Sequence, residues 1–232
     1  MTLPTVIIPG YLAGAAPYRS LEADLNQRGL WTVTVPLTRR SWLPTVGGRS
    51  VQPILTAIAA TIAHAQAVTG SDRVNLVGHS AGGWIARIYL GDRPYNVHQV
   101  DRDRTNCWSG YKHVNTLVTL GTPHMSQERW TRRNLDFVNQ TYPGAFHPQI
   151  KYVCVAGKAV FGHRWRTWFT YNSYQLTAGE GACWGDGITP IAAAHLASAQ
   201  NLILDDVYHS PKPAIAWYGS PQIVEQWLAY LD

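Results

Sequence analysis

The stretch Gly78-His79-Ser80-Ala81-Gly82 constrains the fold of this chain more than any other, because it separates two segments of different periodicity. The apolar run before it, residues 73–77, predicts a buried strand, and residues 81–90 after it predict a helix. A G-x-S-x-G sequence in this setting indicates a sharp turn that raises the serine hydroxyl above the end of the strand. A plain glycine turn between a strand and a helix is the alternative. Either interpretation requires strands that alternate with helices.

The rest of the chain repeats this alternation. Strands are predicted at residues 5–8, 31–35, 73–77, 114–120, 151–156 and 201–204, and helices at residues 18–28, 51–68, 81–90, within 191–199 and at 221–231. The pattern predicts an α/β fold with a central, mostly parallel sheet flanked by helices. Residues 1–232 are expected to form a single domain with lid-like insertions at about 91–113, 125–149 and 159–184.

The composition is that of a globular protein. Of the 232 residues, 46% are hydrophobic and 14% are charged, whereas disordered chains have few hydrophobic and many charged residues. The formal net charge of +5 favours approach to anionic surfaces. No dense Lys/Arg stripe is present, so a nucleic-acid partner is not expected.

The cysteines and the amino terminus bear on the cellular compartment. Cys107, Cys154 and Cys183 are too few for a disulfide-stapled domain, although a pair between Cys107 and Cys183 remains open. The sequence shows no signal peptide and no apolar run of about 20 residues that would span a membrane. We therefore expect a cytoplasmic protein.

A serine hydroxyl becomes a strong nucleophile only beside a base, and the base needs an acid to orient it. Behind a G-x-S-x-G turn of this kind, the acid and then the histidine follow the serine along the chain. Asp186 is the predicted acid, because it lies in a Gly-Asp-Gly turn after the strand at 151–156. The alternative for Asp186 is an Asx-turn without a catalytic role. Asp205 and Asp206 are rivals, but they lie close to the end of the last strand and to the histidine.

His209 is the predicted base. It follows the last predicted strand, and loops after parallel strands leave the sheet at the same edge as Ser80. Two other histidines are rivals. His79 lies inside the turn beside Ser80, so its side chain is expected to point away from the hydroxyl. His195 is expected to lie on the helix within residues 191–199.

An oxyanion that forms at the attacked carbonyl needs backbone N–H donors. Ala81, directly after the predicted nucleophile, is expected to supply one donor. The loop Pro9-Gly10-Tyr11-Leu12 is expected to supply the second from Tyr11, with Leu12 as the alternative. A simple turn that ends the first strand is the other interpretation of this loop. The sequence contains no recognisable metal-binding or nucleotide-binding spacing, so no metal and no cofactor is expected.

Four segments resemble those of α/β-hydrolase fold lipases and esterases, especially a compact lipase-like branch that includes the GPI inositol-deacylases and related cyanobacterial and plastid hydrolases. The segments are Ile7-Ile8-Pro9-Gly10-Tyr11, Gly78-His79-Ser80-Ala81-Gly82-Gly83, Leu120-Gly121-Thr122-Pro123-His124 and Gly185-Asp186-Gly187-Ile188-Thr189-Pro190. Many lipases have His-Gly before the oxyanion residue, where this chain has Pro9-Gly10. The resemblance implies a structural role for His124.

The resemblance also implies hydrolysis of carboxylic esters, in particular of small-molecule or lipid esters, through an acyl-enzyme on Ser80. One alternative is a thioesterase or an acyltransferase that uses the same three residues. Another is a lipid-binding protein that has kept the fold and lost catalysis. A large separation of His209 or Asp186 from Ser80 would favour this last alternative.

Two segments in the insertions mix aromatic and cationic side chains. They are His163-Arg164-Trp165-Arg166-Thr167-Trp168-Phe169-Thr170-Tyr171 and Trp130-Thr131-Arg132-Arg133. One hypothesis is transient contact with a membrane surface, with the rings at headgroup depth and the arginines on anionic lipid. The other, which we favour because aromatic insertions often cover a core, packs the rings into the domain and leaves the arginines in solvent.

Overall fold

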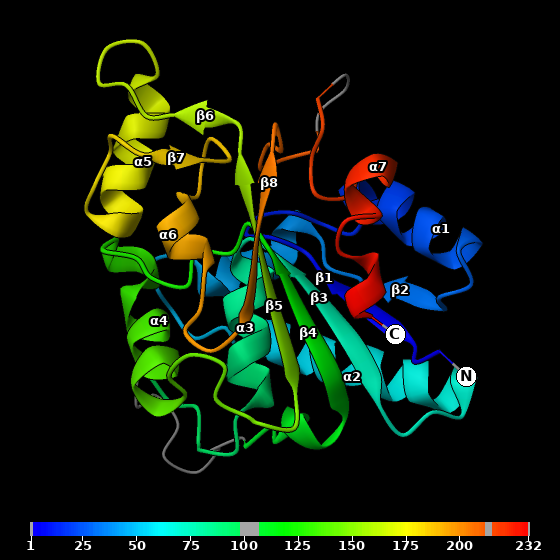
Figure 1. Ribbon diagram of the computed structural model, residues 1–232. Helices are drawn as coiled ribbons and strands as arrows, with labels where there is room; N and C mark the ends of the chain where they lie inside the picture. The colour runs from blue at the N-terminus through cyan, green and yellow to red at the C-terminus, as the bar shows by residue number, and fades with distance from the viewer. Residues whose placement is uncertain (1, 98–106, 212–214, 232) are drawn as a thin grey trace.

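The computed structural model describes residues 2–97, 107–211 and 215–231. Within these residues, a parallel sheet has the strand order β2-β1-β3-β4-β5-β8. Its strands are β1 (Thr5–Ile8), β2 (Thr32–Thr34), β3 (Val74–His79), β4 (Val114–Leu120), β5 (Lys151–Lys158) and β8 (Gln200–Asp205). A separate antiparallel pair consists of β6 (Val160–Phe161) and β7 (Trp184–Gly185). The predicted fold class, a mostly parallel sheet flanked by helices, is confirmed (Figure 1).

The helices cover both faces of the sheet. They are α1 (Arg19–Gln27), α2 (Gln52–Thr69), α3 (Ala81–Leu90), α4 (Arg129–Thr141), α5 (Trp168–Ala178), α6 (Ile191–Ala194) and α7 (Pro221–Val224), with 3-10 turns at Ala16–Tyr18, Arg39–Thr45, Gly110–Lys112 and Leu228–Tyr230. Helices α2 and α3 pack on one face, and α1 and the carboxyl-terminal segment pack on the other (Figure 1).

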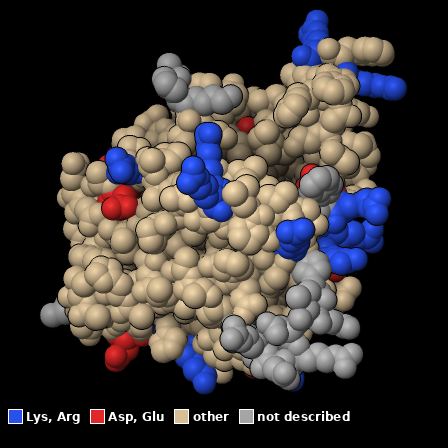
Figure 2. Space-filling view, turned by 180° about the vertical axis from the view of Figure 1, so that it is seen from behind, with Lys and Arg blue, Asp and Glu red and all other residues tan. Residues whose placement is uncertain are grey.

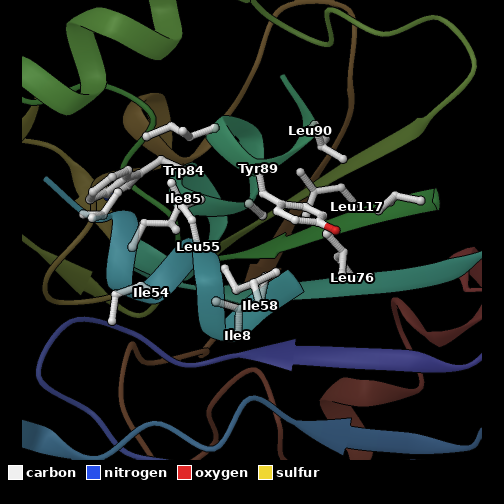
Figure 3. Packing of buried hydrophobic residues seen from close by; sticks show 14 of the residues in the cluster. Ile8, Ile54, Leu55, Ile58, Leu76, Trp84, Ile85, Tyr89, Leu90 and Leu117 are labelled. Atoms are coloured by element: carbon white, nitrogen blue, oxygen red, sulfur yellow. The ribbon is translucent and has the colours of Figure 1, made fainter. Parts of the chain in front are cut away.

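Two hydrophobic cores follow from the alternation of side chains along the strands, since successive residues point to opposite faces of a sheet. On β1, Ile8 joins the core beneath α2 and α3, whereas Ile7 joins the core beneath α1. Figure 3 shows the first core, where side chains of α2 and α3 meet those of the strands. Strands β1, β3, β4 and β5 are therefore largely buried on both faces, which explains why they read as apolar runs, whereas the edge strand β8 exposes residues such as Ile203.

The order of the strands alone indicates where a ligand site is expected in this sheet. From β1 the chain continues to β2 on one side and then to β3 on the other side of β1. In open α/β sheets, ligands bind outside the carboxyl ends of the strands where the order reverses in this way. The loop at Gly10 follows β1 and Ser80 follows β3, so both lie at this reversal.

Two helix predictions near the carboxyl terminus are wrong. The helix expected at residues 221–231 stops after α7, and the chain continues through i→i+3 hydrogen bonds such as Trp227 N–H to the Val224 carbonyl. This tighter winding accompanies complete burial of Trp227, whose indole N–H donates to the Tyr218 carbonyl at 3.0 Å. His195 is not on a helix, because α6 ends at Ala194 and His195 is extended, with φ −100° and ψ 150°.

The insertions contain regular structure that the sequence did not predict. The insertion at 125–149 holds α4, and the one at 159–184 holds β6, α5 and β7. Part of the insertion at 91–113 lies outside the described residues. In Figure 1 the segment from β6 to β7 projects beyond the carboxyl ends of the sheet strands.

The cysteines are free. Cys107 is exposed, Cys154 is buried and Cys183 is half-buried, so the pair between Cys107 and Cys183 that the sequence left open does not form. Among the described residues, no helix is both long and apolar enough to cross a bilayer.

Candidate active site

Ser80 lies in a strained turn between β3 and α3. Its backbone has φ 52° and ψ −125°, a conformation that is rare for a residue with a side chain. The neighbouring glycines make this turn sterically feasible. A Cβ atom on Gly78 would meet the backbone of Gly83, and one on Gly82 would meet the Ile8 carbonyl oxygen. The turn therefore has the form that the G-x-S-x-G sequence predicted.

Ser80, His209 and Asp186 meet at the carboxyl edge of the sheet. The Ser80 Oγ lies 3.0 Å from His209 Nε2, and His209 Nδ1 lies 2.7 Å from Asp186 Oδ2. His209 is in the loop after β8, and Asp186 directly follows β7. Because the Asp186 carboxylate accepts the proton on Nδ1, the Nε2 lone pair is free to accept the Ser80 hydroxyl proton.

Asp186 is buried with each carboxylate oxygen hydrogen-bonded twice. The Oδ1 atom accepts the N–H groups of Ile188 at 2.9 Å and Thr189 at 2.7 Å. The Oδ2 atom accepts His209 Nδ1–H and the Tyr218 hydroxyl, each at 2.7 Å. Burial by itself would raise the pKa of Asp186, but the charge and hydrogen bond of His209 and the two backbone donors hold it below its ordinary value. The carboxylate is thus kept ionised beside His209.

Tyr218 belongs to the site, although sequence reasoning missed it. Its hydroxyl accepts the Gly157 N–H at 2.8 Å and donates to Asp186. Burial and the Asp186 charge raise the pKa of Tyr218 well above its ordinary value, so the hydroxyl keeps its proton. No motif or spacing marks this tyrosine in the sequence; its only signal is its place shortly after His209.

His79 forms a chain of hydrogen bonds behind Ser80. The Gly10 N–H donates to the Tyr18 hydroxyl at 2.9 Å, and Tyr18 donates to His79 Nδ1 at 2.7 Å. His79 Nε2 then donates to the His209 carbonyl at 2.9 Å. Burial and the charge of His209 lower the pKa of His79 to about 3, so the ring is neutral. With both ring nitrogens engaged, His79 cannot act as the base for Ser80.

The other rivals lie away from Ser80. Asp205 is exposed and pairs with Lys158 at 3.2 Å, and Asp206 follows it in a left-handed conformation with φ 58°. His195 Nε2 lies 3.4 Å from the Leu202 carbonyl. His124, for which the resemblance implied a structural role and not a catalytic one, is buried, with Nε2 3.2 Å from the Thr119 hydroxyl. None of these four side chains is bonded to Ser80 or His209 in the described part of the chain.

Comparisons with solved structures identify the architecture. EstA from Clostridium botulinum superimposes with a TM-score of 0.63 at 11% identity, covering 100% of this chain and 87% of that one. Est1E from Butyrivibrio proteoclasticus superimposes with a TM-score of 0.55 at 12% identity, and the match covers 99% of this chain and 88% of that one. An alpha-beta serine hydrolase homologue from Coxiella burnetii superimposes with a TM-score of 0.51 at 12% identity, and the match covers 100% of this chain and 84% of that one.

The chain has the α/β-hydrolase fold. No protein-family model and no curated protein sequence matches it. At these identities the likeness establishes the fold alone, so the chemistry has to be argued from the site itself.

In this α/β-hydrolase fold, one predicted oxyanion donor directly follows Ser80 and the other lies in the loop after β1. Ala81 is the first residue of α3, where helix N–H groups have no acceptor within the helix. Gly10 lies against the nucleophile, since a Cβ atom there would be 3.0 Å from Ser80 Cβ. Tyr11 follows directly, and its ring packs edge-on against Trp42 with centroids 5.3 Å apart. The donor role of Tyr11 and Ala81 stays a prediction.

A cavity of about 230 Å³ opens beside Ser80. Helices α4 and α5 form its walls, together with the start of α3 and the loop after Asp186. The apolar lining comes from Trp84, Pro123, Leu135, Leu176 and Ile188, and the polar lining from Ser126, Glu128, Thr131, Ser173, Thr177 and Thr189. Among the described residues, no cluster of three or more His, Cys, Asp or Glu side chains is suited to hold a metal ion.

Proposed function

We propose that the protein is a serine hydrolase that cleaves carboxylic esters through an acyl-enzyme on Ser80. The observation that carries this proposal is the contact of Ser80 Oγ with His209 Nε2 and of His209 Nδ1 with Asp186, at 3.0 and 2.7 Å. A hydroxyl, a base and an orienting acid in this order form the arrangement that activates serine for acyl transfer. The same contacts count against a non-catalytic lipid-binding protein.

Each residue has one role in the proposed reaction. His209 Nε2 takes the proton of Ser80 as its Oγ attacks the acyl carbonyl, and Asp186 stabilises the resulting imidazolium. The N–H groups of Ala81 and Tyr11 hold the oxyanion. His209 then protonates the leaving alcohol, and a water molecule deprotonated by His209 releases the acid from Ser80.

The cavity beside Ser80 supports an acyl group as the bound part of the substrate. Leu135, Leu176 and Ile188 give the cavity apolar wall area. We therefore infer that this cavity receives part of the acyl chain of the substrate.

Covalent labelling with a fluorophosphonate tests the proposal, because this probe reacts with activated serines. Intact mass should show one adduct on the wild type, none on Ser80→Ala and a sharply lower labelling rate on His209→Ala. Ser71→Ala, a serine in the turn before β3 at the opposite edge of the sheet, is the matched control and should label at the wild-type rate. A folded wild-type protein that takes up no adduct would refute the proposal.

A further inference from the structure

Three large rings stand in solvent between β6 and the first turn of α5. Trp165, Trp168 and Phe169 are 88%, 63% and 72% exposed. The sequence favoured rings packed into the domain, and for these three residues that interpretation is wrong. Soluble proteins seldom gather several large exposed rings in one short segment unless the segment binds something.

The same segment is cationic. Residues 159–179 contain Arg164 and Arg166 but no aspartate or glutamate, and both arginines are exposed. The Arg164 guanidinium lies 5.7 Å from the centre of the Trp165 ring. The upper right corner of Figure 2, where this projecting segment of Figure 1 is seen from behind, shows blue atoms beside tan ones and no red ones.

Hydrogen bonds hold the exposed segment in a defined turn. The Thr167 hydroxyl accepts the His163 N–H at 2.6 Å and donates to the Phe161 carbonyl at 2.8 Å. Tyr174 of α5 is fully buried, and its hydroxyl accepts the Gly187 N–H at 2.8 Å. Trp168 and Phe169 are thus presented by an anchored helix, and Trp165 lies in the hydrogen-bonded turn that precedes it.

Helix α5 also connects this surface to the candidate active site. Ser173, Leu176 and Thr177 of α5 line the cavity that opens beside Ser80. Any surface that binds the first turn of α5 is therefore no farther from the cavity than the length of this helix.

We propose that Arg164, Trp165, Arg166, Trp168 and Phe169, here called the α5 tip, form a docking surface for a bilayer that contains anionic lipids. Trp and Phe side chains partition into the headgroup region, and arginines bind lipid phosphates. A projecting tip suits a bilayer, which admits inserted rings, better than a folded protein partner, which needs about 800 Å² from each surface. The absence of acidic side chains from residues 159–179 complements the negative charge of the lipid.

Co-sedimentation with vesicles tests the docking surface. The wild type should bind vesicles of phosphatidylcholine with phosphatidylglycerol, and salt should weaken this binding. Trp165→Ala/Trp168→Ala/Phe169→Ala should reduce the partition coefficient at least tenfold. Arg164→Gln/Arg166→Gln should reduce it about thirtyfold on anionic vesicles and little on pure phosphatidylcholine.

The matched control removes two cations at the opposite edge of the sheet. Lys112 and Lys151 are exposed near the amino ends of β4 and β5, and each lies beside a tyrosine ring, as Arg164 lies beside Trp165. Lys112→Gln/Lys151→Gln should change vesicle binding less than twofold. All variants should keep the wild-type thermal unfolding midpoint, because the substituted side chains are exposed.

The docking proposal does not depend on catalysis, so Ser80→Ala should bind vesicles as the wild type does. The proposal is overturned if the wild type ignores anionic vesicles, or if the lysine control loses as much binding as the arginine variant. It is also overturned if light scattering shows self-association that the triple ring variant abolishes while vesicle binding persists, since the occupant would then be a second copy of the chain.

Discussion

At the level of single residues, the site depends on how firmly His209 is held. Its Nδ1 proton points to a carboxylate whose other contacts are already filled, and its backbone carbonyl accepts a hydrogen bond from His79. The ring therefore has one tautomer and one orientation toward Ser80. Tyr218 contributes to this arrangement indirectly. Its hydroxyl is hydrogen-bonded to Asp186 and not to Ser80 or His209.

Tyr218→Phe should lower kcat/KM about ten- to a hundredfold, because it removes one hydrogen bond to a buried carboxylate. The effect should fall on kcat rather than KM, since Tyr218 does not line the cavity. The loss of this donor should also favour the protonated form of the hydrogen-bonded pair of Asp186 and His209, and so shift the acid limb of the pH–rate profile upward. Steady-state kinetics of a soluble ester across pH would measure both effects.

The control for Tyr218→Phe is Tyr230→Phe, which removes a hydroxyl from a half-buried tyrosine that packs with Lys151 at 4.9 Å. It should leave kcat and the pH profile unchanged. If Tyr218→Phe behaves like this control, Tyr218 has only a packing role.

At the level of secondary-structure elements, the sequence predicts best what is encoded locally. The unit of β3, the turn at Ser80 and α3 could be predicted because glycine spacing and apolar runs determine it over about a dozen residues. Asp186 and His209 could be selected because the order of strands along the chain restricts which loops reach Ser80. The structure brings both to Ser80, at the distances a hydrogen-bonded chain requires.

Elements without a local pattern could not be predicted. Among its described side chains, α5 buries only Tyr174, so it has no apolar stripe, and its most apolar residues are exposed. The residues after α7 wind more tightly than an α-helix because Trp227 turns into the core. Tyr18 and Tyr218 reach the site through tertiary packing, and the sequence gives no spacing for such contacts.

Gly82→Ala provides a test of the turn as an element. Alanine is favoured over glycine in a helix by about 1 kcal/mol. The added Cβ would nevertheless meet the carbonyl oxygens of Ile8 and Pro9, just before Gly10. We expect a net destabilisation of about 1–3 kcal/mol from overpacking and a slower rate of fluorophosphonate labelling. Urea unfolding and labelling kinetics would measure the two effects.

Gly29→Ala serves as the comparison for Gly82→Ala. Gly29 has φ 85° and no atom within 4 Å of a Cβ placed on it. This variant should lose about 1 kcal/mol to backbone strain and label at the wild-type rate. A Gly82→Ala protein that is as stable and reactive as the wild type would show that the turn tolerates a side chain.

At the level of the whole molecule, buried histidines link stability to pH. Burial and the charge of His209 lower the pKa of His79 to about 3, and burial with the charge of Arg87 lowers that of His124 well below its ordinary value. Burial also lowers the pKa values of His147 and His195. In the unfolded chain these rings titrate near pH 6.5. Below that pH the unfolded state therefore binds more protons than the folded state.

Stability should accordingly be greatest above about pH 6.5 and should fall as the pH decreases toward 3, the folded value for His79. In this range, each histidine that stays neutral in the folded protein lowers the free energy of unfolding by up to about 1.4 kcal/mol for each pH unit of acidification. His79→Gln should flatten the slope, because it removes one of the buried rings that stays neutral in the fold. Urea unfolding between about pH 7.5 and 4.5 would measure the slope. Stability that stays constant or increases on acidification would mean that these histidines accept protons within the folded protein.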